Sequence, residues 1–472
     1  MSEDVIRRVF NPERIVPPSM RYKVIGIPQF KVVHQRSVRD LINFWSSEAK
    51  QLIWERAWNY VMVGDHYNTR WFVGGLIDAY RNIVGKHKST WVWDKPAIIW
   101  ESEEGITRVY TYSDLNEMVI KYSSILRGLG VGPHDWVMFY APPMPEVIAL
   151  ALASVRLGAP FEFVFTGFGG ALDLARRISD RKPKVLITVD AFPRRGGKPI
   201  TVKSTVDKAL SAINHNLKVL IINRMSVNVG VVQGRDLYID EAPTLDAGED
   251  YVADSTHPLF GLHIGYDEDL GLITHGVGGY LVQTYSTTRW MGLRPHDTYF
   301  CTVLPGWITG ITYVVFGPFM IGSTVVLYEG GPDYPHWDRW WSILERYAVT
   351  VFLTTGAALR ILSRQDPNLL LSHNLDMLRL ILTTAEPPLE ASVWRWTYQF
   401  VGTGGTVPTI DSLPSKLSGR IPVVHMFIQS ELGTFVTGSL PNYTFVPLVP
   451  GSVGPPQCPA STLTWSMRMG TP

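Results

Sequence analysis

Apolar residues cluster in the middle of the chain and predict a set of buried elements there. The run from Tyr299 to Leu304 predicts a buried strand, and Ile308–Met320 predicts an apolar helix that a Gly-Pro pair interrupts. Thr324–Glu329 begins with β-branched residues and predicts a second strand. Residues 311–328 carry no charge and approach the roughly 20 residues that cross a bilayer. Their glycines, proline and β-branched run nevertheless favour a buried core over a membrane helix.

Strands and helices alternate on both sides of this segment, which implies a layered α/β fold. The predicted strands are 97–100, 136–140, 161–165, 185–189, 219–222, 349–354 and 378–382. The predicted helices are 113–129, 145–157, 170–181, 205–212, 340–347, 357–363 and 392–400. Thr111 and Asp114 have the spacing of a helix-capping pair. Nearer the N-terminus, the amphipathic stretch Ser37–Trp54 predicts one helix.

The composition is that of a globular protein. Of the 472 residues, 46% are apolar and 18% are charged, and the net charge of +1 lacks the basic excess of nucleic-acid binders. The length suggests about two to three domains. The first ten residues contain no apolar run of a signal peptide. The two cysteines, Cys301 and Cys458, lie in no metal or redox motif and predict a reducing, cytoplasmic location, with Cys301 a buried structural thiol rather than a nucleophile.

A dense group of motifs in the apolar segment resembles one enzyme family. These motifs are Trp307-Ile308-Thr309-Gly310, Tyr313, Phe316-Gly317-Pro318, Glu329-Gly330 and Pro332-Asp333-Tyr334-Pro335. They resemble the central motif of the acetyl-CoA synthetases, the AMP-forming branch of the adenylate-forming ligases. The resemblance implies the large α/β domain of that family, built from stacked layered subdomains. It divides the chain into an N-terminal extension that wraps the main lobe (1–94), a first α/β subdomain (95–256), a second α/β subdomain with the pocket motifs (257–456) and a tail (457–472).

The same resemblance implies an acyl pocket and a nucleotide site. The Trp-Ile-Thr-Gly turn would line the acyl pocket, with walls from Trp307, Ile308, Thr309, Thr384 and Ile428. Ile428 stands where acetate-specific members carry tryptophan, and a smaller side chain there predicts a carboxylate longer than acetate. The adenine loop and the glutamine-glutamate motif of the family align with Ala385, Glu386, Pro387, Gln429, Ser430 and Glu431. The resemblance makes Glu431 a magnesium ligand, whereas Glu386-Pro387 alone is equally typical of a helix start.

A basic loop offers a third candidate site. Arg194, Arg195 and Lys198 surround Gly196-Gly197, so three cations stand on backbone that can approach an anion closely. In the family, the matching arginine-rich loop holds the phosphates of coenzyme A. An ordinary solvated basic turn is the other interpretation of these residues.

One segment departs from the family in its chemistry. Where the family has a loop of hydroxyls, glycines and a lysine that grips ATP phosphates, residues 263–271 have no lysine and no serine or threonine, and they carry Asp267, Glu268 and Asp269 in a row. Like charges about 4 Å apart repel by roughly 4 kcal/mol at a surface-like dielectric. The acids could bind Mg²⁺ together with a nucleotide, but a run of three favours a solvated hairpin tip.

Two functions follow from these observations. The first is an active short- to medium-chain acyl-CoA ligase that uses ATP, Mg²⁺ and coenzyme A and is completed by a separate chain. The second is an inactive or impaired homologue that binds an acyl-CoA-like ligand or a protein partner as a scaffolding subunit. The altered loop favours the second function, as does our expectation that the small C-terminal domain with its catalytic lysine is absent. No residue is assigned a catalytic role, and we expect neither nucleic acid nor membrane as a partner.

Overall fold

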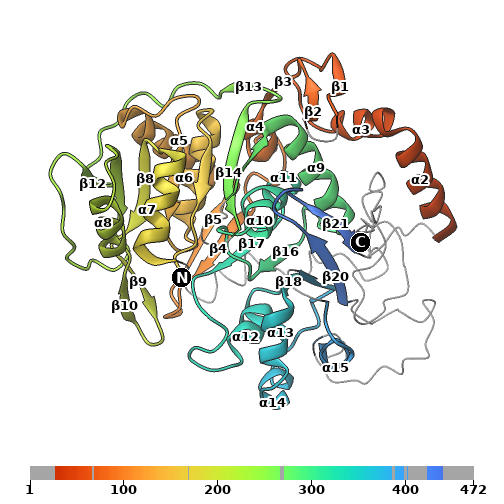
Figure 1. Cartoon of the computed structure of the whole chain (residues 1–472). Coiled ribbons are helices and arrows are strands. Elements are labelled where there is room, and N and C mark those ends of the chain that lie inside the picture. The colour runs from red at the N-terminus through yellow and green to blue at the C-terminus, as the bar shows by residue number, and fades with distance from the viewer. Residues whose placement is uncertain are drawn as a thin grey trace, which may run out of the picture.

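Two large β-sheets organise the part of the chain that the computed structural model describes, namely residues 27–65, 68–167, 169–265, 271–384, 388–397, 401 and 423–438 (Figure 1). One sheet has seven strands in the order β12-β11-β8-β6-β7-β14-β15, and the other has eight in the order β21-β20-β19-β18-β16-β17-β4-β5. Neighbouring strands are parallel except for the edge pairs β14–β15, β4–β5 and β20–β21. The predicted layered α/β fold is therefore confirmed.

The seven-stranded sheet is formed largely from the first half of the chain. Its strands are β6 (Val137–Tyr140), β7 (Phe161–Phe163), β8 (Val185–Val189), β11 (Lys218–Ile222), β12 (Asp236–Tyr238), β14 (Pro258–Ile264) and β15 (Gly271–Gly276). Helices α5 (Tyr112–Gly128), α6 (Pro145–Arg156), α7 (Gly170–Arg181) and α8 (Lys203–Ser211) accompany it, with α5 packed on α6 and α7 on α8 (Figure 1). Every residue of β6 and β8 is buried, as expected for parallel strands covered on both faces.

The eight-stranded sheet draws most of its strands from the second half. They are β4 (Pro96–Glu101), β5 (Thr107–Thr111), β16 (Thr298–Cys301), β17 (Thr324–Tyr328), β18 (Val351–Thr355), β19 (Leu380–Thr384), β20 (Val423–Ile428) and β21 (Phe435–Gly438). Its helices include α12 (Arg339–Arg346), α13 (Gly356–Leu362), α14 (Pro367–Leu371) and α15 (Ala391–Trp396), whereas α9 (Val277–Trp290) packs against β15 of the seven-stranded sheet. Each sheet also contains two strands from the other half of the chain. β4 and β5 precede residue 256 but join the eight-stranded sheet, and β14 and β15 follow residue 256 but join the seven-stranded sheet.

The apolar segment predicted as core is buried between the sheets. It forms α10 (Ile308–Gly310), the π-helical turn η5 (Ile311–Phe316) and α11 (Gly317–Ile321) before entering β17. All side chains from Ile308 to Tyr328 are buried, which confirms the prediction of core. No helix in the described ranges is long and apolar enough to cross a membrane.

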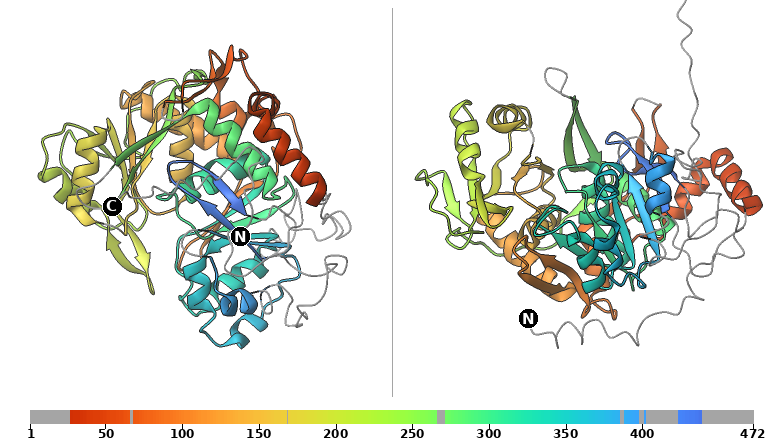
Figure 2. Two further views of the ribbon diagram at one scale, coloured as in Figure 1. Left: turned by 45° about the vertical axis from the view of Figure 1, so that its right-hand side comes forward. Right: turned by 90° about the horizontal axis from the view of Figure 1, so that it is seen from below.

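The N-terminal region corrects one prediction. The expected single helix Ser37–Trp54 is instead two helices, α2 (Ile27–Arg39) and α3 (Leu41–Ala49). Asp40 separates them because its side chain accepts a hydrogen bond from the backbone amide of Asn43 and so starts a new helix. The region continues through β1 (Tyr60–Val63), β2 (Arg70–Val73), β3 (Leu76–Asp78) and α4 (Ala79–Ile83), and β3 pairs with β13 (Val252–Asp254). Helices α2 and α3 lie at the opposite end of the molecule from the hairpin of β9 (Ala191–Arg194) and β10 (Lys198–Thr201) (Figure 2).

Candidate active site

A cavity of about 690 Å³ lies where the two sheets meet. The seven-stranded sheet contributes the ends of β7 and β14 together with α7, and the eight-stranded sheet contributes the turn before α10 and the turn after β20. Its lining includes Phe165, Arg176, Arg177, Ile264, Trp307, Ile308, Ser430 and Glu431. The carboxyl ends of parallel strands are the usual place for a ligand in such folds.

A second cavity of about 250 Å³ adjoins the first. The two share Phe163, Val164, Phe165 and Gly306 in their linings. Arg194 and Ile200 of the β9–β10 hairpin line the second cavity. Gly306 is needed at the junction because a side chain there would lie only 2.8 Å from the Cβ atom of Phe165. The basic hairpin therefore faces a cavity that borders the first one.

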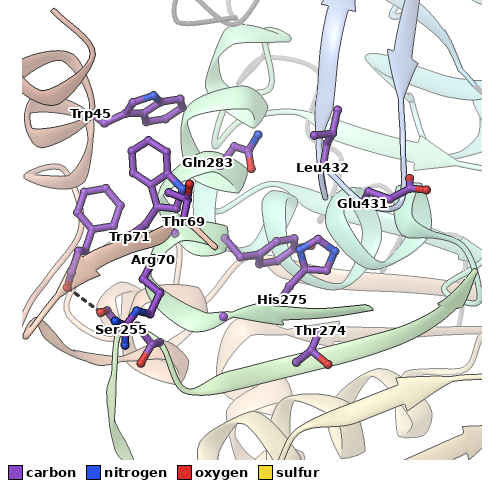
Figure 3. Close-up of a pocket in the computed structure, with 15 residues that line it drawn as sticks. Trp45, Thr69, Arg70, Trp71, Ser255, Thr274, His275, Gln283, Glu431 and Leu432 are labelled. Atoms are coloured by element: carbon purple, nitrogen blue, oxygen red, sulfur yellow. Dashed lines mark hydrogen bonds between the residues drawn. The ribbon is translucent and has the colours of Figure 1, made fainter. Parts of the chain in front are cut away.

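A third cavity of about 480 Å³ lies on the other side of the turn that carries Glu431 (Figure 3). Trp45 and Trp71 from the N-terminal region, Tyr280 from α9 and His275 from β15 line it. Glu431 lines this cavity as well as the first, so the turn after β20 forms the wall between them.

The structure brings four of the predicted pocket residues to the first cavity: Trp307, Ile308, Ser430 and Glu431. Trp307 is 43% exposed at the edge, whereas Ile308 is buried. The other predicted residues in the described ranges do not line this cavity. Thr309 and Thr384 are buried, Ile428 packs partly buried against the core, and Gln429 is exposed. Ala385, Glu386 and Pro387 lie outside the described residues.

The three cations of the β9–β10 hairpin have different surroundings. Arg194 donates a hydrogen bond from Nη1 to the carbonyl oxygen of Glu329 at 2.7 Å and lies 3.8 Å from a carboxylate oxygen of Glu103. The side chain of Arg195 is 80% exposed, 3.2 Å from Asp333, and Lys198 is exposed. The hairpin turn has positive φ at Arg195, Gly196 and Gly197, which explains the two glycines. Arg195 and Lys198 are therefore the two cations of this hairpin that an incoming anion reaches most easily.

A buried ionic cluster beneath this hairpin was missed by the sequence analysis. Glu329 is fully buried, and burial raises the pKa of its carboxyl group to about 7 although Arg224 opposes the shift. The Nε atom of Arg224 lies 3.0 Å from Glu329, and its Nη2 atom lies 3.1 Å from Glu104. Burial also raises the pKa of Glu103. Glu329 stood in a recognised motif, but its partners are remote in sequence and no local signal indicates them.

The two strands that flank the segment that departs from the family pair with each other, while residues 266–270 between them lie outside the described residues, so the hairpin tip stays a prediction. β14 pairs with β15 from Pro258↔Gly276 to Ile264↔Gly271. The last residues of β14 before the turn are fixed because the fully buried Glu162 of β7 contacts Nδ1 of His263 at 2.5 Å and Nε of Arg181 at 2.7 Å. The three acids Asp267, Glu268 and Asp269 lie outside the described residues.

Among the described residues, two carboxylates line this cavity, Asp173 and Glu431, and Asp173 is engaged with Nε of Arg177 at 2.8 Å. No group of three or more His, Cys, Asp or Glu side chains within those ranges could hold a metal ion by itself. Glu431 is exposed on the cavity wall, which suits Mg²⁺ that takes its remaining oxygen ligands from a nucleotide and water.

Comparisons with known proteins agree with this fold. The family model described as AMP-binding enzyme matches residues 86–256 and 272–458, and the model described as acetyl-coenzyme A synthetase N-terminus matches residues 30–83. The break in the first match, residues 257–271, contains β14 and the segment that departs from the family. The chain thus belongs to the AMP-binding enzymes, and within them to the AMP-forming acyl-CoA synthetases.

Individual relatives support the same family. The chain is 38% identical over 420 residues to the acetyl-coenzyme A synthetase of Rubrobacter xylanophilus, covering 87% of this chain and 62% of that protein. It is 38% identical over 415 residues to the 3-hydroxypropionyl-coenzyme A synthetase of Metallosphaera sedula, covering 86% and 60%. The acetoacetyl-CoA synthetase structure from Streptomyces lividans shares the fold with a TM-score of 0.75 at 24% identity, covering 87% of this chain and 61% of that one. The chain therefore spans less than two thirds of the length of these proteins.

Proposed function

We propose that this chain forms an acyl- and CoA-binding site of the acyl-CoA synthetase type whose grip on the phosphates of ATP is weakened, so that the chain alone adenylates carboxylates poorly or not at all. The observation that carries this proposal is the altered segment of residues 257–271, where the family match is interrupted. It lacks the lysine and the serine and threonine hydroxyls of a phosphate loop and carries three adjacent acids instead. Trp307, Ile308, Ser430 and Glu431, which the resemblance assigns to the site, line the first cavity.

The ligands follow from the cavities. A short carboxylate would lie beside Trp307 and Ile308, and relatives of the chain are named for acetyl and 3-hydroxypropionyl groups. Thr309, Thr384 and Ile428 do not line this cavity, and their part in an acyl pocket stays a prediction. The phosphates of coenzyme A would bind Arg195 and Lys198, and the pantetheine arm would run through the adjoining cavity toward Gly306.

The chemistry of adenylation explains why the altered phosphate loop should weaken the use of ATP more than the binding of an acyl-adenylate. In adenylation, a carboxylate oxygen attacks the α-phosphorus of ATP and pyrophosphate leaves, so charge develops on the β- and γ-phosphates and must be stabilised. Three carboxylates near those phosphates oppose this step. An acyl-adenylate has lost the β- and γ-phosphates. The site should therefore tolerate an acyl-adenylate better than ATP.

Two further roles are compatible with this proposal. An active ligase, completed by a separate chain, is favoured by Glu431, which lies on the cavity wall where nucleotide-bound Mg²⁺ needs a carboxylate. A scaffolding subunit that binds a protein partner would use the same fold without catalysis. The cytoplasmic location and the magnesium, ATP and coenzyme A ligands remain part of the proposal.

Isothermal titration calorimetry tests the proposal directly. We expect 5′-O-(N-propionylsulfamoyl)adenosine, which mimics an acyl-adenylate, to bind at least roughly tenfold more tightly than MgATP, a difference of about 1.4 kcal/mol. Coenzyme A should also bind measurably. Equal affinity for ATP and the analogue would contradict a weakened phosphate grip, and no binding of either the analogue or coenzyme A would contradict the retained site.

A further inference from the structure

The turn between β20 and β21 carries Ser430 and Glu431 and is exposed on its outer side. Gln429, Glu431 and Leu432 are all exposed, whereas Gly433 and Thr434 are buried. An exposed glutamate on a short turn could not keep a fixed direction without anchors on the inner side. Those anchors come from two other elements, β15 and the π-helical turn η5.

The first anchor is His275 on β15, which points toward the turn (Figure 3). Its Nε2 atom lies 2.9 Å from the carbonyl oxygen of Ser430. A carbonyl oxygen can only accept, so Nε2 carries the proton and donates it. The ring stacks on Phe260 with centroids 4.8 Å apart. Burial lowers the pKa of His275, although the Ser430 carbonyl and the Glu431 carboxylate partly oppose this, and the neutral ring is therefore favoured near pH 7.

The second anchor is Thr312 within η5. Its Oγ1 atom donates to the carbonyl oxygen of Gly433 at 2.6 Å, and the hydroxyl of Tyr280 on α9 lies 2.8 Å from the same Oγ1 atom. Because the threonine proton is used on Gly433, Tyr280 must be the donor in this pair. The next residue, Tyr313, accepts at its hydroxyl from the amide of Phe435 at 3.3 Å and stacks on the Phe435 ring. Consecutive residues of a π-turn thus bind the same loop, and such turns are frequent at functional sites.

The packing leaves the turn no room to shift. Gly433 has φ of +79°, a conformation that suits glycine. A Cβ atom there would lie 3.1 Å from the His275 ring and 3.2 Å from the Tyr280 ring. The turn is therefore held by the hydrogen bonds that the carbonyl oxygens of Ser430 and Gly433 accept. Close packing of Gly433 against the rings of His275 and Tyr280 holds it as well.

We propose that His275 and Thr312 are positioning residues that fix the direction of Glu431, so that this carboxylate faces the first cavity and can meet a ligand there. Neither residue lines that cavity, and each acts through a backbone carbonyl of the turn. The inference rests on the proposed function only in treating the first cavity as the ligand site. The anchoring itself is testable without any ligand.

Hydrogen–deuterium exchange of peptides that cover residues 429–435 measures the anchoring directly. His275→Phe keeps a ring to stack on Phe260 but cannot donate, and Thr312→Val keeps the shape without the hydroxyl. We expect each to raise exchange of these amides roughly tenfold, because losing one buried hydrogen bond eases local opening. Thr312→Ser should restore protection. Two matched controls make the same changes elsewhere: His87→Phe removes a bond to the Phe319 carbonyl, and Thr188→Val removes one to the Tyr140 carbonyl.

Binding of the acyl-adenylate analogue in the presence of Mg²⁺ supplies the second measurement. We expect its dissociation constant to rise about fivefold in His275→Phe and Thr312→Val and to stay unchanged in Thr312→Ser and in both controls. The positioning role would be overturned if His275→Phe and Thr312→Val left exchange of residues 429–435 unchanged. It would also be overturned if the two control variants raised exchange of these residues by the same amount. Increased exchange with unchanged affinity would overturn its link to the ligand. An analogue that fails to bind the unaltered chain would refute the proposed function, while the exchange result would still decide the anchoring.

Discussion

The guanidinium group of Arg194 donates to the main-chain carbonyl oxygen of Glu329 at 2.7 Å, and this bond joins the two-stranded β9–β10 hairpin to the end of β17 in the eight-stranded sheet. A residue that resemblance places in a coenzyme A loop thus also connects that hairpin to the eight-stranded sheet. Because Arg194 is engaged with Glu329 and Glu103, it is a poorer candidate for a phosphate contact than its exposed neighbours.

Substitution of Arg194 should therefore have a different effect from substitution of Arg195 or Lys198. We expect Arg195→Ala and Lys198→Ala each to weaken coenzyme A binding about fivefold at low salt with little effect on stability, since both side chains are exposed. Arg194→Ala should instead lower the free energy of unfolding by about 1–2 kcal/mol, because the Glu329 carbonyl loses a charged donor. Calorimetric titration with coenzyme A and urea unfolding measure the two effects. Loss of stability in Arg195→Ala without loss of affinity would reverse this assignment.

Neutralising the acidic run should strengthen nucleotide binding. We expect the triple variant Asp267→Asn, Glu268→Gln and Asp269→Asn to bind MgATP roughly tenfold more tightly, because it removes like-charge repulsion. A control with Asp240, Glu241 and Glu249 neutralised, all exposed between β12 and β13, makes the same change in net charge elsewhere. Weaker binding in the triple variant would show that the acids bind Mg²⁺ together with the nucleotide.

The buried His87 predicts sensitivity to acid. Burial lowers its pKa from 6.5 to about 4, although the bond from Nε2 to the Phe319 carbonyl opposes the shift. The unfolded chain therefore binds this proton more readily than the folded protein. Its contribution to stability is constant above pH 6.5 and is lost as the pH falls toward 4.

Between about pH 7 and pH 5, the loss from this group amounts to roughly 2 kcal/mol. Urea unfolding at the two pH values should show it, and His87→Gln, which can still donate to the Phe319 carbonyl but does not titrate there, should reduce the pH dependence by about that amount. His425, whose pKa burial lowers to about 4 as well, leaves a further acid dependence in the variant. An identical pH dependence in both proteins would refute the assignment.

Local signals in the sequence predicted much of the fold. The predicted bounds of α7 and β8 match the structure residue for residue, because both are clear amphipathic or continuously apolar runs. The capping box of α5, with Thr111 and Asp114 bonded to each other's backbone, was predictable from two residues three apart. The family was predictable because many motif positions around Trp307 agree at once.

Long-range relationships were not predictable in this way. Which sheet a strand joins depends on tertiary packing: β4 and β5 join the eight-stranded sheet, and β14 and β15 join the seven-stranded sheet, although each pair lies in the other half of the chain. The π-turn that brings Thr312 to Gly433 leaves no mark on an apolar run, and the bond joins residues 121 positions apart. The pairing of Glu162 with His263 likewise depends on β7 lying beside β14. Such contacts require the fold before they can be seen.

Carboxylate-dependent exchange of pyrophosphate into ATP tests the central claim most directly. The purified chain would be assayed with Mg²⁺ and a series of carboxylates from acetate to hexanoate, after cooperative unfolding in urea has shown that it is folded. We predict no exchange above the background without carboxylate, because the altered loop cannot hold the phosphates through adenylation. Exchange that depends on the carboxylate would contradict the weakened phosphate grip and establish the chain as an adenylating enzyme.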